Sequence, residues 1–263
     1  MFCTATVLSV PQFAYALNQS DISYGPHPSQ SLDICTPATG SPPKGTVILI
    51  HGGGWTGGDK ASLSSLCRRL SKQGLVALNI NYHLVDGSPE SAWPAQLNDV
   101  KKAIVWANSQ SGFPHRYCLM GFSAGAHLAI KAAEKDFSGT GVTFPIECVV
   151  DNFGPTIFKK GSILWAATCR LVNETDDSEC SRKAKMLEPG PPGTGISYLL
   201  VHGRSDGLVP VTDSEELLAR YKEHGVSVEL VIYDGDHSYK GLPLPKTELL
   251  IQRQIDFIAK AMR

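Results

Sequence analysis

The stretch Gly121-Phe122-Ser123-Ala124-Gly125 decides the fold that we expect for this chain. It follows an apolar run, Arg116–Met120, and it precedes an apolar helical pattern over His127–Lys135. A serine with a glycine two positions before it and another two positions after it, at a strand-to-helix junction, is typical of the nucleophile elbow, a turn so tight that only small residues fit at those two positions. The turn lifts the Ser123 hydroxyl clear of the sheet and places it at a helix N-terminus, where developing negative charge is stabilised. The sequence therefore predicts an α/β fold with Ser123 as a nucleophile.

Other apolar runs alternate with helical patterns along the rest of the chain. They are rich in Val, Ile and Leu and mostly do not alternate with polar residues, which is typical of strands buried on both faces. Alternation of strand and helix predicts βαβ units, a mostly parallel sheet and helices on both faces. We expect a single domain over residues 20–263, preceded by an N-terminal arm or signal segment over residues 1–19. The further runs are Gly45–Ile50, Leu75–Tyr82, Cys148–Asn152, Ser197–His202 and Val228–Tyr233.

A glycine-rich segment, His51-Gly52-Gly53-Gly54-Trp55, directly follows the strand predicted at Thr46–Ile50. Acyl transfer develops a negative oxygen that needs preorganised N–H donors, and glycine backbone can aim its N–H groups without a Cβ in the way. We expect Gly53, Gly54 and the N–H of Ala124 to form this oxyanion hole. A phosphate-binding loop is the rival interpretation, but such a loop would end in G-K-[ST], and that ending is absent.

One of the eight histidines has the position of a catalytic base. His237 follows the last predicted strand, in the turn Asp234-Gly235-Asp236-His237. In folds with this elbow the chain order is Ser, then Asp or Glu, then His, and the histidine lies on the loop after the final strand. We therefore predict His237 as the base.

The acid of the triad must orient His237 and stabilise its charged form. Asp206 lies in a glycine-containing turn after the strand Ser197–His202, which is the expected place. Asp151, Asp234 and Asp236 are competitors. The last two are too close to His237 in sequence for the usual order, so we predict Asp206.

Two features bear on the substrate pocket. The aromatic residues Trp55, Phe122 and Trp93 are candidate pocket walls, although aromatic residues near a core are equally often part of that core. Residues 157–195 form a connection too long for an ordinary loop, which we interpret as a small cap or lid insertion.

Composition narrows the classes of partner. The 263 residues carry a net charge of −1, without the basic stripe that nucleic-acid binding requires. No apolar run approaches the roughly 20 residues of a membrane span. There is no CxxC pair, which argues against a structural zinc site, and the predicted chemistry requires neither a metal nor a cofactor. We expect a small-molecule substrate, and the oligomeric state is left open.

Cysteines and the N-terminus leave the compartment unsettled. Cys35, Cys118 and Cys148 lie in strand-like runs and Cys67 on a helix face, so we expect four thiols of the core. Cys169 and Cys180 flank a polar stretch and could close a loop in an oxidising compartment. Residues 1–16 end in Ala-Tyr-Ala like a signal peptide, but they contain no Lys or Arg. These features favour a cytoplasmic protein slightly over a secreted one.

With these motifs in place, the chain resembles the carboxylesterases of the α/β-hydrolase fold. It is most similar to bacterial feruloyl and acetyl esterase-like enzymes and to kynurenine formamidase-like enzymes. The resemblance extends from about Tyr24 to the C-terminus. It rests on the elbow, on His51–Trp55 continuing to Gly58-Asp59-Lys60, on Asn81–Leu84 with Trp93–Val100, on Asp151–Thr156 and on His202–Pro210.

The resemblance implies a serine carboxylesterase that hydrolyses small-acyl esters of acetyl or feruloyl type through a covalent acyl-enzyme. An arylformamidase or amidase with the same triad is the alternative, and a non-catalytic binding module is a third reading. Two departures, His83 where the family usually has Arg and Ala126 where glycine is common, lie beside the predicted machinery. They bear on the substrate and leave the mechanism unchanged.

Overall fold

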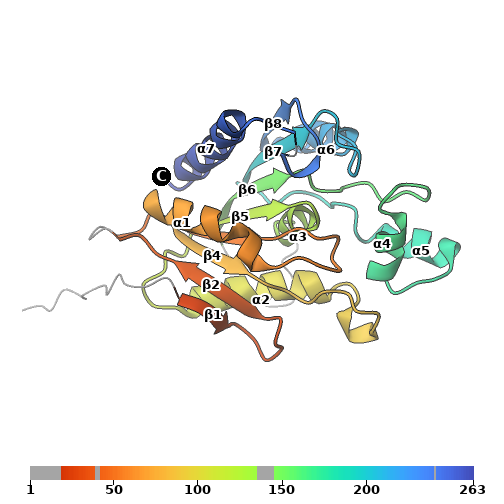
Figure 1. The fold of residues 1–263 in the computed structure, drawn as a ribbon, viewed down its shortest axis with the longest axis horizontal. Coiled ribbons are helices and arrows are strands. Elements are labelled where there is room, and N and C mark those ends of the chain that lie inside the picture. The colour runs from red at the N-terminus through yellow and green to blue at the C-terminus, as the bar shows by residue number, and fades with distance from the viewer. Residues whose placement is uncertain (1–18, 39–41, 135–144, 240) are drawn as a thin grey trace, which may run out of the picture.

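The computed structural model describes residues 19–38, 42–134, 145–239 and 241–263, and within them eight strands form one sheet (Figure 1). The predicted apolar runs are all strands, because each provides Val, Ile and Leu to both faces of the sheet. The strands are β1 (Gln19–Ser23), β2 (Ser31–Cys35), β3 (Thr46–Ile50), β4 (Val76–Ile80), β5 (Tyr117–Phe122), β6 (Ile146–Asn152), β7 (Ser197–Gly203) and β8 (Ser227–Tyr233).

The strand order is β1-β2-β4-β3-β5-β6-β7-β8. Pairing is antiparallel from β1 through β2 to β4 and parallel between all later neighbours, so the sheet is mostly parallel, as expected. The carboxyl ends of β3, β5, β7 and β8 therefore meet at one edge. In a parallel sheet this edge is where ligands bind, because the loops that follow the strands converge there.

Helices cover both faces of the sheet, and each face has its own apolar core (Figure 1). α1 (Ser64–Lys72) and α7 (Leu244–Ala261) pack on one face through Leu66, Leu70, Ile255 and Ile258. The opposite face is covered by α2 (Ala95–Ser109), α3 (Ala124–Ala132) and α6 (Thr212–Glu223). This layering is the α/β-hydrolase fold that the sequence predicted.

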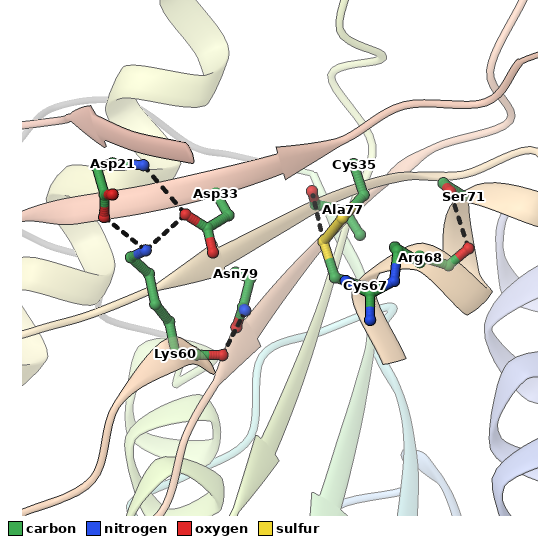
Figure 2. The surroundings of a disulfide bond; sticks show 9 residues. All are labelled: Asp21, Asp33, Cys35, Lys60, Cys67, Arg68, Ser71, Ala77 and Asn79. Carbon is green, nitrogen blue, oxygen red and sulfur yellow. Dashed lines mark hydrogen bonds and ion pairs between the residues drawn. A yellow bond between two sulfur atoms is a disulfide. The ribbon is translucent and has the colours of Figure 1, made fainter. Parts of the chain in front are cut away.

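The prediction of four free core thiols is wrong. Cys35 at the end of β2 forms a disulfide with Cys67 of α1, and Figure 2 shows this bond beside the ion pairs of Lys60 with Asp21 and Asp33. Cys118 of β5 forms a second disulfide with Cys148 of β6, its partner in the strand register. The Cα atoms are 5.8 Å and 4.6 Å apart in the two pairs, within the range that a disulfide spans. The sequence alone could not predict these two disulfides, because they depend on the strand register and on the packing of a helix against the sheet.

The segment 157–195 contains two short helices, α4 (Trp165–Leu171) and α5 (Asp177–Ala184), which extend beyond the carboxyl edge of the sheet (Figure 1). A third disulfide, Cys169–Cys180, joins them and closes the loop that the sequence had left open. Three disulfides favour an oxidising compartment over the cytoplasm, since cytosolic thiols are kept reduced.

Residues 1–18, including the expected arm or signal segment and Cys3, lie outside the described part of the chain. Within that part, no helix combines the length and the apolar character that a membrane crossing needs.

Candidate active site

Ser123 occupies the sharp turn between β5 and α3, with φ 52° and ψ −120°. The turn is possible because the chain passes close to its neighbours: a Cβ on Gly125 would lie 2.3 Å from the Ile50 carbonyl oxygen. The Ser123 N–H donates to the Asn152 carbonyl over 2.8 Å, and the Asn152 side chain donates to the Gly121 carbonyl over 3.0 Å. The elbow is therefore fixed from both flanking strands.

The side chains of Ser123, His237 and Asp206 form one hydrogen-bonded chain. His237 Nε2 lies 3.0 Å from Ser123 Oγ, and His237 Nδ1 lies 2.7 Å from Asp206 Oδ2. Since a carboxylate only accepts, Nδ1 carries the proton and Nε2 is free to accept the serine hydroxyl. The Asp206 side chain is fully buried, whereas that of His237 remains 15% exposed. This geometry allows His237 to act as a general base on Ser123.

Asp206 is held in its charged form. Burial by itself would raise the pKa of this carboxyl, but hydrogen bonds from His202 and His237 outweigh burial. Oδ1 also accepts the N–H groups of Leu208 and Val209, both over 2.9 Å. Together these donors hold the pKa of Asp206 well below its usual range. The sequence analysis missed the buried His202, whose Nε2 lies 3.4 Å from Asp206 Oδ2.

The two competing aspartates near His237 have other partners. Asp234 forms an exposed ion pair with Arg204. Asp236 Oδ1 accepts the N–H groups of His237 and Gly207 over 2.7 and 3.1 Å. Asp236 thereby ties together the loops that carry the base and the acid.

The third competitor, Asp151, is buried beneath the elbow and does not contact His237. Its Oδ1 accepts the Gly154 N–H over 2.8 Å, whereas Oδ2 has no hydrogen-bond partner among the described residues. Burial raises the pKa of Asp151 to about 6, from an ordinary 3.8. The unfolded chain therefore releases this proton at lower pH than the folded protein does.

Because the pKa of Asp151 is higher in the folded protein than in the unfolded chain, the free energy of unfolding should fall as the pH rises from about 4 to about 6 and stay reduced above that range. We expect Asp151→Asn to be more stable than the unchanged protein by about 1–3 kcal/mol at pH 8, and to differ little near pH 4. Thermal unfolding across this pH range measures the difference. Asp234→Asn, at an exposed aspartate, is the control. An equal effect of Asp151→Asn at both ends of the range would contradict the assignment.

The glycine-rich segment after β3 lies against the elbow. Gly52, Gly53 and Gly54 line the same cavity as Ser123, and Gly53 has a φ of 124°, which favours glycine. Ala124 does not line the cavity, but it begins α3, so its N–H has no partner within the helix. His51 supports the segment: its Nδ1 contacts the Gly52 carbonyl at 2.7 Å. Gly53 and Gly54 thus line the cavity that Ser123 lines, and Ala124 directly follows the serine at the start of α3.

A cavity of about 720 Å³ opens above the triad. Of the three candidate wall aromatics, Phe122 lines it, together with Phe153, which the sequence analysis missed. The remaining walls come from α1 and the turn before it, from α7 and from the loops after β7 and β8, and none of the lining residues belongs to the segment 157–195. That this segment forms a small cap stays a prediction.

Trp55 and Trp93 do not line the cavity. Both pack against the fully buried His127, with ring centroids 5.4 Å apart in each pair. Burial lowers the pKa of His127 to about 3, and its Nε2 donates to the Leu187 carbonyl over 2.9 Å. His127 therefore joins the segment 157–195 to α3, and the two tryptophans pack around its ring.

No group of three or more His, Cys, Asp or Glu side chains suitable for a metal ion occurs within the residues that the structure describes. The hydrogen-bonded serine, the glycine-rich donors and the apolar cavity together form a site equipped for nucleophilic attack on a carbonyl carbon.

The sequence profile of the BD-FAE family matches residues 32–221, which include β2 through most of α6. The chain belongs to the BD-FAE family. Among curated relatives of this BD-FAE protein, esterase LipQ of Mycobacterium tuberculosis is 37% identical over 131 residues, which are 47% of this chain and 30% of LipQ. Isoprenylcysteine alpha-carbonyl methylesterase ICME of Arabidopsis thaliana is 27% identical over 237 residues, covering 81% of this chain and 55% of ICME. The BD-FAE chain thus spans about half or less of the length of these two relatives.

The fold of the BD-FAE chain matches those of solved esterases. A truncated carbohydrate esterase from gut microbiota superimposes with a TM-score of 0.77 and 22% identity, covering 94% of this chain and 97% of that one. At this identity the likeness establishes the α/β-hydrolase fold.

Proposed function

We propose that this protein hydrolyses carboxylic esters through a covalent acyl-enzyme on Ser123. The observation that carries the proposal is the continuous hydrogen-bonded chain from Ser123 through His237 to the buried Asp206. The esterase relatives and membership of the BD-FAE family support the same reaction.

In the proposed mechanism, Ser123 Oγ attacks the ester carbonyl carbon while His237 Nε2 takes the hydroxyl proton. The negative oxygen of the tetrahedral intermediate accepts hydrogen bonds from the N–H groups of Gly53, Gly54 and Ala124. Asp206 holds the imidazole in its productive tautomer and stabilises the imidazolium. His237 then donates the proton to the departing alkoxide, which leaves an acyl group on Ser123.

Water completes the cycle by the same route. His237 accepts a proton from the water as it attacks the acyl carbonyl, and it returns that proton to Ser123 Oγ as the acid departs. We propose esters with small acyl groups, of acetyl or feruloyl type, as the substrates. The apolar cavity of about 720 Å³ has the size of sites that bind drug-sized molecules, so it accommodates an aromatic acyl group.

The decisive experiment measures kcat/KM on p-nitrophenyl esters from acetate to decanoate, beside methyl ferulate and N-formylkynurenine. Fast turnover of acetate or ferulate is the expected result. Strong turnover of the formamide alone would replace the proposal by an arylformamidase. Absence of turnover on every compound by folded protein would favour a binding module.

A further inference from the structure

The cavity above the triad continues into a groove between two helices. α1 and α7 both begin near the carboxyl edge of the sheet, and they run back along the same face (Figure 1). Leu63 and Leu66 line the cavity from the first side, and Ile251 lines it from the second. A substrate bound at Ser123 can therefore extend an apolar group between the helices.

An ion pair crosses this groove. The Arg69 guanidinium contacts the Glu248 carboxylate, and it also donates to Gln252 Oε1 over 3.3 Å and to the Glu248 carbonyl over 3.4 Å. Arg69 and Glu248 both line the cavity. Arg69 lies three residues beyond Leu66 on the same helix face, which places it about 4.5 Å further along α1. The apolar walls therefore end at a charged bridge.

The bridge is polar and partly hydrated. The Arg69 side chain is 26% exposed and that of Glu248 58% exposed. An apolar chain that reached this point would have to displace water from both charges without replacing its hydrogen bonds, which is unfavourable.

We propose that the Arg69–Glu248 ion pair is a specificity-determining element that limits the length of the apolar ester group held between α1 and α7. This inference rests on the proposed function, since it concerns the substrate of the same site. It assigns the site to esters with a short or compact apolar group, and it locates the selection on α1 and α7. The segment 157–195 has no part in it.

Two single substitutions test the proposal, Arg69→Ala and Glu248→Ala. Each removes the bridge from a different helix, and an exposed ion pair contributes too little stability for its loss to unfold the protein. We expect kcat/KM for octanoate and decanoate esters to rise at least tenfold relative to acetate in both variants. A matched series of alkyl acetates identifies whether the groove holds the acyl or the alcohol group.

Arg253→Ala is the control, because it breaks another exposed ion pair of α7, with Glu229, outside the cavity. The ratios of kcat/KM between long and short esters should be the same in this variant as in the unchanged protein. Unchanged long-to-short ratios in both bridge variants, across both ester series, would overturn the inference while leaving the esterase proposal in place. Absence of Ser123-dependent hydrolysis in the unchanged protein would overturn both.

Discussion

Replacing Ser123 by alanine is expected to lower kcat for ester hydrolysis by about 10⁴- to 10⁶-fold. Without Oγ no acyl-enzyme forms, and only binding and the oxyanion donors remain to accelerate attack by water. Stopped-flow and long-time-course assays on p-nitrophenyl acetate measure the loss. The double variant Ser123→Ala/His237→Ala should be no slower than Ser123→Ala alone, since the two residues act as one unit.

Ser109→Ala at the end of α2 is the matched control and should keep full activity. Reaction of the unchanged protein with a fluorophosphonate should add the mass of one phosphonyl group. Peptide mapping should locate this group on the peptide that contains Ser123. Retention of more than a tenth of the activity in Ser123→Ala would refute the assignment of the nucleophile.

Reduction of the disulfides is expected to have the largest effect on stability. The bonds close loops with separations of 32, 30 and 11 residues, for which chain entropy predicts about 3–4 kcal/mol each. Their sum, about 10 kcal/mol, is comparable to the whole free energy of unfolding of a typical domain. Protein refolded under reducing conditions should therefore unfold at least about 10 °C below the oxidised protein, or fail to refold.

Differential scanning fluorimetry of both forms measures this difference. Alkylation verifies the redox states, because the six cysteines of the three disulfides should take a label in the denatured reduced chain and none in the denatured oxidised chain. The pair variant Cys169→Ala/Cys180→Ala should lose only about 3 kcal/mol and keep its activity, because this disulfide lies outside the cavity. Equal unfolding temperatures in the two redox states would contradict the expectation.

The positions of the buried strands and of the elbow along the chain were predictable because both depend on short local patterns. Buried strands read as apolar runs, and the elbow needs small residues on each side of Ser123, where a Cβ on Gly121 would lie 2.2 Å from the Gly125 carbonyl oxygen. The positions of Asp206 and His237 followed from the strands that precede them. The structure brings all three side chains together, although their catalytic roles remain predictions.

The pocket walls were not predictable, since they depend on contacts between distant segments. Arg69 and Glu248 are 179 residues apart in sequence, and only the packing of α1 and α7 on one face brings them together. Trp55, by contrast, was predicted as a pocket wall but does not line the cavity. It follows the glycine-rich segment, which suggested a wall, but its ring turns into the core and packs on His127.

His202 was missed for a related reason. It is a buried residue near the end of β7, and only the turn that follows this strand carries Asp206 back toward its ring. Nothing in the sequence distinguishes a histidine that contacts a catalytic carboxylate from any other histidine near the end of a strand.

The attachment of the segment 157–195 to α3 has a consequence for engineering. Leu187 is fastened to His127, Glu188 accepts a hydrogen bond from Lys131, and Gly190 donates one to Glu134, all on the far side from the groove. Chimeras that exchange this segment between relatives would therefore have to keep these three contacts with the recipient. If the Arg69–Glu248 pair limits the ester group as proposed, such chimeras would retain the recipient's preference among esters, because they retain its α1 and α7.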